Sequence, residues 1–197
     1  MTGIGVTLPE TCDVAFKEWE TVCDALASGG QSLILRKGGI DEGAGGFKPE
    51  HEAFWLYPTN VHQQQQGVKP EANETSRFSA TPETEVPIQS LACIALIRRI
   101  ERVEELEALD SLHIWTQETV EKRFHYRTPG LWAIGVRIYR RPQPVILPVT
   151  PEYLGCKTWV PLGKAISTRE LEPVLPEQEF QVAIDAIRKG LSSTATT

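Results

Sequence analysis

Apolar and polar side chains alternate most clearly over residues 131–141, where Ile134, Val136 and Ile138 share one face. This period of two predicts a strand with one buried face. Pro142 and Pro144 follow, and we expect them to separate this strand from a short one at 145–147. Further apolar runs predict strands at 32–36, at 52–57 before Pro58, at 86–100 with a break near Ser90, and at 158–160.

Apolar residues at helical spacing predict helices between these strands. The first runs over 14–27, with Asp13 as its N-cap and Gly29-Gly30 at its end. The last follows Pro176 and carries Phe180, Ile184 and Ile187 on one face. Shorter helices are predicted at 60–66, 104–109 and 116–125, and a polar loop at 67–85.

The order of these elements indicates the fold class. Regular helical crossovers between strands are lacking, which argues against a doubly wound parallel sheet. We therefore expect an α+β fold, with a small mixed or barrel-like sheet flanked by helices. One domain is expected over residues 13–191, between an N-terminal tail at 1–12 and a disordered tail at 192–197.

Charge is unevenly distributed along the chain. The net charge is −6 and the pI about 5.3, so the molecule as a whole does not attract a polyanion. Residues 121–141 are nevertheless rich in lysine and arginine, and an acidic block precedes them at 101–110. Nucleic-acid binding would therefore have to rest on a local basic patch.

Several classes of protein are disfavoured. The four cysteines are scattered without metal-ligand spacing, and neither a Walker loop nor a dinucleotide fingerprint is present, so we expect no metal and no cofactor. No apolar run is long enough to span a bilayer. The first residues do not resemble a signal peptide, so the expected location is the cytoplasm.

The first candidate site is the run Arg36-Lys37-Gly38-Gly39, which follows a predicted strand. Two cations beside glycines that allow close backbone approach suit a phosphate or carboxylate. The alternative is a glycine turn with solvated cations.

Two histidines lie near this run in sequence. His51 and His62 are the candidates for general acid or base, because histidine titrates near neutral pH. The alternative is that both are ordinary loop residues.

The predicted strand at 131–141 supplies a further candidate surface. Alternation places Arg137, Tyr139 and Arg141 on one face, where they could contact phosphates and stack on bases. The alternative is a solvated face neutralised by the acidic block at 101–110.

Several segments resemble a bacterial family of unknown function, domain of unknown function 1802. They are FKEW, LILRKGGI, GGF and YPT within residues 14–63, HIWT at 113–116, VRIYRRPQP at 136–144 and YLGCKTWVPL at 153–162. The resemblance spans most of residues 13–163. It implies no activity, because the family is uncharacterised.

A looser resemblance is to PUA-like and ASCH barrels, in which a helix leads through a glycine into a strand that ends in arginine. Leu26 to Arg36 follow that pattern. The resemblance implies binding of RNA or modified bases. Gln31 stands where that motif usually has lysine, which speaks against amidohydrolase chemistry.

The leading hypothesis is a module that binds RNA, DNA or a nucleotide through Arg36, Lys37, Arg137 and Arg141, with His51 or His62 in the same cleft. Two alternatives stay open: a hydrolase acting on a nucleotide or modified base, and a non-catalytic domain with a protein partner. The sequence leaves open whether the protein is an enzyme and what its oligomeric state is.

Overall fold

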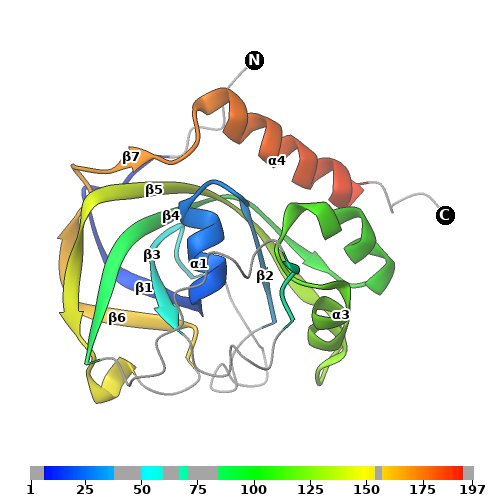
Figure 1. The fold of residues 1–197 in the computed structure, drawn as a ribbon, viewed down its shortest axis with the longest axis horizontal. Coiled ribbons are helices and arrows are strands. Elements are labelled where there is room, and N and C mark those ends of the chain that lie inside the picture. The colour runs from blue at the N-terminus through cyan, green and yellow to red at the C-terminus, as the bar shows by residue number, and fades with distance from the viewer. Residues whose placement is uncertain (1–6, 38–49, 60–66, 71–83, 154–156, 193–197) are drawn as a thin grey trace.

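The computed structural model describes residues 7–37, 50–59, 67–70, 84–153 and 157–192 (Figure 1). Its elements, in chain order, are β1 (Thr11–Trp19), α1 (Glu20–Ala27), β2 (Leu33–Arg36), β3 (Ala53–Thr59), β4 (Glu85–Ile100), the 3₁₀ helix η3 (Val103–Leu112), α3 (Gln117–His125), β5 (Leu131–Pro148), the 3₁₀ turn η4 (Pro151–Tyr153), β6 (Trp159–Ser167), β7 (Glu172–Pro173) and α4 (Glu177–Ser192). The predicted α+β class is confirmed.

The strands form one mixed seven-stranded sheet in the order β2-β5-β4-β3-β1-β6, with β7 pairing with β5. β1 and β3 are parallel and the other pairs are antiparallel. The long strands β4 and β5 curl, so that the sheet bends around α1, while α4 and α3 lie outside it (Figure 1). This is the small, mixed, helix-flanked sheet that the sequence predicts.

Most of the predicted elements are present. β2, β3, β4 and the first part of β5 lie where the apolar patterns place them, and the break near Ser90 is a shift of register. Thr116 caps α3 as a threonine N-cap should, because its Oγ1 accepts a hydrogen bond from Thr119 N at 3.4 Å. The last helix begins at Glu177, directly after Pro176.

The predicted helix over 14–27 is wrong in its first half. Residues up to Trp19 form β1, which pairs with β3 on one side and β6 on the other. Two-sided pairing satisfies the backbone of this segment, and tertiary context of this kind overrides helical spacing. The helix therefore begins at Glu20, and Asp13 is not its N-cap. The predicted helix at 60–66 lies outside the described residues.

Two other boundaries also differ from prediction. β3 continues through Pro58 to Thr59, and β5 continues through Pro142 and Pro144 to Pro148. In β5, Arg140 pairs with Ser90 and Val145 with Ile88, so residues 141–144 face a single residue of β4. A bulge tolerates prolines, because its residues need not donate to the ladder.

The buried apolar side chains form two clusters, which divide the side chains of β3 between them. Phe54 and Leu56 belong to the cluster that receives the helices, whereas Trp55 and Tyr57 belong to the other. Successive strand side chains point to opposite faces, which explains this division. Among the described residues, no helix combines the length and the apolar character needed to cross a bilayer.

Gly190 permits the close approach of α4 to η3. A Cβ at this position would lie 2.9 Å from the backbone oxygen of Ala108 and 2.8 Å from a methyl group of Leu109. We expect Gly190→Ala to lower the free energy of unfolding by about 1–3 kcal/mol, because the backbone cannot yield as a flexible side chain can. Urea unfolding measures this change, and a variant as stable as the wild type would contradict the prediction.

Candidate functional site

A pocket of about 640 Å³ opens between α3 and the ends of β1 and β2. We call it the α3 pocket. Its described lining residues are four cations, one acid, two aromatic residues, two threonines and a glycine: Arg36, Lys37, Lys122, Arg123, Glu118, Trp19, Tyr126, Thr116, Thr119 and Gly67. A volume of this size is typical of small-molecule sites.

One face of α3 and its flanks forms a wall of the pocket. Thr116, Thr119, Arg123 and Tyr126 recur three or four positions apart, the spacing that places side chains on one face of a helix. The short segment around Gly67 fixes the start of the helix. Its N–H donates to Thr119 Oγ1 at 2.9 Å, and its carbonyl accepts from Thr116 N at 3.1 Å.

Arg123 is packed between two tryptophans. Its guanidinium carbon lies 4.6 Å from the ring centroid of Trp19 and 5.1 Å from that of Trp115. Its Nη1 is buried and has no hydrogen-bond partner among the described residues. Burial lowers the pKa of Arg123 to about 10, with Glu18 opposing the decrease and Arg36 adding to it. The guanidinium thus remains charged at neutral pH.

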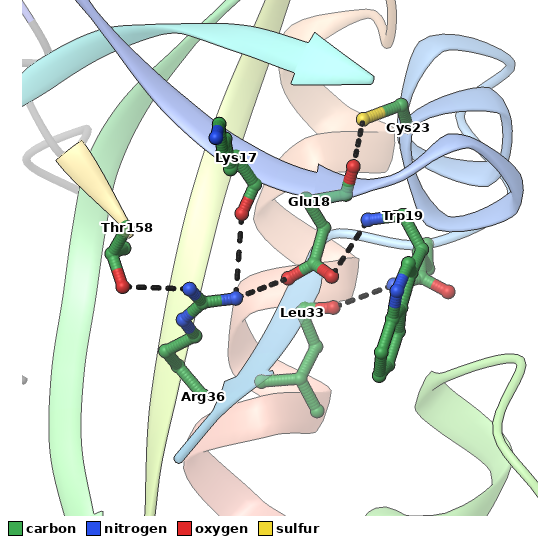
Figure 2. A network of polar contacts seen from close by, with 8 residues as sticks. Lys17, Glu18, Trp19, Cys23, Leu33, Arg36 and Thr158 are labelled. Atoms are coloured by element: carbon green, nitrogen blue, oxygen red, sulfur yellow. Dashed lines mark hydrogen bonds and ion pairs between the residues drawn. The ribbon is translucent and has the colours of Figure 1, made fainter. Parts of the chain in front are cut away.

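Arg36 joins the two ends of the open sheet, as Figure 2 shows. Its Nη2 donates to Thr158 Oγ1, just before β6, at 2.6 Å, and its Nη1 donates to the carbonyl of Lys17 at 3.3 Å. Glu18 Oε2 lies 3.9 Å from Nη1, and only 2% of the Glu18 side chain is exposed. Arg36, which the sequence predicts to bind a phosphate, is therefore also a structural residue that closes the barrel-like sheet.

Lys37 holds the carbonyl end of α3. Its ammonium donates to the carbonyls of Phe124 at 2.8 Å and Gly130 at 2.9 Å, and to that of Thr128. These bonds use its three donors and place a cation at a helix C-terminus, where it is stabilised. Burial lowers the pKa of Lys37, and Arg99 adds to the decrease. Lys37 therefore supplies positive charge to the pocket and rigidity to the turn.

The described lining residues of the pocket carry an excess of positive charge. Neither Lys37 nor Arg123 forms an ion pair with a carboxylate in the described part of the chain. Glu118, the one acid among the described lining residues, pairs with Lys122 at 2.6 Å. Cations that have no carboxylate partner favour an anion as ligand. The net charge of these lining residues is thus positive, whereas the net charge of the molecule is negative.

The predicted arginines of β5 lie elsewhere. Arg137 pairs with Glu177 of α4, and Arg141 pairs with Glu170 at 2.9 Å. Tyr139 is buried at 7% exposure, and burial raises its pKa. None of the three is among the described residues that line the α3 pocket. The arginines on this face are neutralised by Glu177 and Glu170, and not by the acidic block at 101–110.

Of the other predicted site residues, the structure describes His51 alone. His51 packs edge-on against Trp159, with 4.8 Å between ring centroids, and is not among the described lining residues. Gly38, Gly39 and His62 lie outside the described residues. The structure thus brings Arg36 and Lys37 together in one pocket, and His51 to a different position.

Sequence comparison supplies the family. A model of a domain of unknown function, DUF1802, matches residues 15–186. The chain belongs to this family. The match extends the predicted resemblance beyond residue 163 and ends within α4.

Solved structures similar to this DUF1802 domain include two crystal structures of ASCH from Zymomonas mobilis. A point mutant of that protein is 15% identical, with 90% of this chain and 98% of that chain covered and a TM-score of 0.42. The unmutated protein is 14% identical, with 87% and 93% covered and a TM-score of 0.42. No curated protein matches the chain.

Sequence reasoning missed the centre of the α3 pocket. Arg123 and Tyr126 belong to the basic stretch at 121–141, yet the site residues predicted from that stretch all came from its strand at 131–141. The missed signal is the shared helical face of Thr116, Thr119, Arg123 and Tyr126. Trp19 packs against the core, and its ring also lies against Arg123 at the pocket wall.

Proposed function

We propose that this DUF1802 domain binds a nucleotide unit, free or within a nucleic acid, in the α3 pocket. The observation that carries the proposal is Arg123, a charged guanidinium stacked on tryptophans at a pocket wall, with no carboxylate partner among the described residues. The nearby charges of Arg36 and Lys37 have the same sign. A phosphate would pair with the guanidinium of Arg123 and accept hydrogen bonds from it.

The other lining residues suit the remainder of a nucleotide. Tyr126 is 52% exposed and offers a ring face on which a base can stack. Thr116 and Thr119 carry hydroxyl groups that can bond to sugar or base. The combination of cations, an exposed aromatic ring and hydroxyl groups is what separates a nucleotide site from a site for a simple anion.

Replacement of Arg123 tests the proposal. We expect Arg123→Gln to weaken binding of nucleoside phosphates and short oligonucleotides by about tenfold or more, because it removes a charge-assisted contact. Isothermal titration calorimetry of the wild type and the variant measures the loss. Mass spectrometry of whatever copurifies with the wild type would name the ligand class.

The control is Arg188→Gln, which removes an equal charge from α4, where Arg188 pairs with Asp185 at 3.0 Å. It should bind as the wild type does. Equal affinity of Arg123→Gln and wild type, with both proteins folded, would show that the α3 pocket is not the binding site.

A further inference from the structure

A ridge of alternating cations and aromatic rings adjoins the α3 pocket. It consists of Tyr126, Arg127, Arg99 and Trp132, and we call it the 99–132 ridge. Arg127 lies over the Tyr126 ring at 5.3 Å, and Arg99 over the Trp132 ring at 5.7 Å. Tyr126 itself lines the pocket, so pocket and ridge are continuous at this residue.

The sheet supplies a second connection between them. Trp132 of β5 pairs with Arg36 of β2 on one side and with Arg99 of β4 on the other. A line across three neighbouring strands therefore leads from the pocket wall to the ridge. Neighbouring strands lie about 4.8 Å apart, so this line is comparable with the reach of one or two nucleotides.

The turn that carries Tyr126 and Arg127 is held in place from both sides. Lys37 binds three of its carbonyls, and Arg99 Nη2 donates to that of Pro129 at 3.4 Å. Gly130 N donates to Phe124 O at 3.1 Å. Arg127, at the exposed tip, adopts a left-handed φ of 59°, which is uncommon for a residue other than glycine. A surface fixed in this way loses little entropy on binding.

The ridge cations differ from their neighbours in their partners. Arg98 pairs with Glu105, and Arg102 lies 4.0 Å from Glu104. Arg99 and Arg127 form no ion pair with any carboxylate in the ranges that the structure describes. Their charges are therefore uncompensated beside those of the pocket, in a molecule whose net charge is −6.

We infer that the ligand is a single-stranded polynucleotide, with one nucleotide in the α3 pocket and its neighbours on the 99–132 ridge. This inference rests on the proposed function of the pocket. Phosphates along the strand contact Arg127 and Arg99, and unpaired bases stack on the exposed ring of Tyr126 and against the half-buried ring of Trp132. A duplex keeps its bases stacked inside, so it cannot use the aromatic part of the ridge.

The test compares ligand length. The probes are a nucleoside monophosphate, a fluorescent single strand of about 12 nucleotides, as RNA and as DNA, and the same sequence as a duplex. For the wild type we expect the better-bound single strand to bind at least about tenfold more tightly than both the monophosphate and the duplex.

Arg127→Asn isolates the ridge, because asparagine tolerates the left-handed φ of this position. It should weaken binding of the single strand by about fivefold at low salt, and lower the slope of log affinity against log salt by about 0.7. Binding of the monophosphate should not change. The matched control is Arg169→Asn, in an exposed turn before β7, which should leave both affinities unaltered.

Each outcome separates the two proposals. If the monophosphate binds and Arg123→Gln abolishes its binding, but the single strand binds no more tightly or Arg127→Asn has no effect, the strand inference is overturned and the nucleotide pocket stands. If a duplex binds as tightly as a single strand, the inference is likewise overturned. If Arg123→Gln leaves all binding intact, the proposed function fails, and with it the anchoring of a strand in the pocket.

Discussion

Arg36→Met should lower the free energy of unfolding by about 3 kcal/mol, because it leaves the carboxylate of Glu18 buried without its cationic neighbour. Only 2% of that side chain is exposed. The variant also loses the bonds to Thr158 and to the carbonyl of Lys17, which join β2 to β1 and to the start of β6. For a chain of this size the loss corresponds to a melting temperature lower by roughly 10 °C.

A double-mutant cycle checks the cause. Glu18→Gln in the Arg36→Met background removes the buried charge, so it should restore part of the lost stability. Arg188→Met, in an exposed pair with Asp185, should change stability by less than about 1 kcal/mol. If Arg36→Met is no more harmful than Arg188→Met, Arg36 does not close the sheet as the structure indicates.

Acid should destabilise the protein through His113. This side chain is 6% exposed, and its Nδ1 is buried without a hydrogen-bond partner among the described residues. Burial lowers its pKa from 6.5 to about 4, with Lys69 adding to the decrease, Asp110 opposing it and Arg123 contributing a smaller decrease. The folded protein therefore keeps the imidazole neutral at pH values where the unfolded chain protonates it.

The sign of the effect follows from proton binding. Between pH 6.5 and about 4 the unfolded state binds more protons, so the free energy of unfolding falls as pH is lowered through this window. The full effect of this group is about 3 kcal/mol, reached below about pH 4. Urea unfolding of the wild type and of His113→Gln over this pH range measures it.

Carboxylates titrate in both proteins, so their contribution cancels in the difference between the wild type and His113→Gln. His113→Gln should therefore lose less stability than the wild type between neutral and acid pH, whatever its stability at pH 7. Parallel pH profiles for the two proteins would show that His113 is protonated equally in the folded and unfolded states.

The local pattern of apolar and polar residues was sufficient to predict the first part of β5, α3 and α4. Apolar alternation over 131–141 predicts the first part of β5, although folding buries both faces of this strand, as Ala133 and Tyr139 show beside Ile134. The threonine before 117–125 and the apolar stripe after Pro176 predict α3 and α4. These signals arise within a few residues, so the sequence contains all that is needed to interpret them.

Pairing between distant segments decided the rest. Residues 14–19 fit a helix by spacing, but their neighbours in β3 and β6 make them a strand. Pro142 and Pro144 fit a strand end, but the bulge opposite β4 absorbs them. In both cases the partner strand lies far away in the chain, and no local pattern reports it.

The site shows the same division. The sequence by itself determined that Arg36 and Lys37 stand at a strand end and that cations and aromatic residues gather at 121–141. Only the tertiary structure decided which of those cations keep a free charge. Arg137 and Arg141 meet carboxylates brought close by folding, whereas Arg123 meets two tryptophans. The charge available to a ligand depends on partners in space, because Arg137 and Arg141 pair with residues far away in the chain.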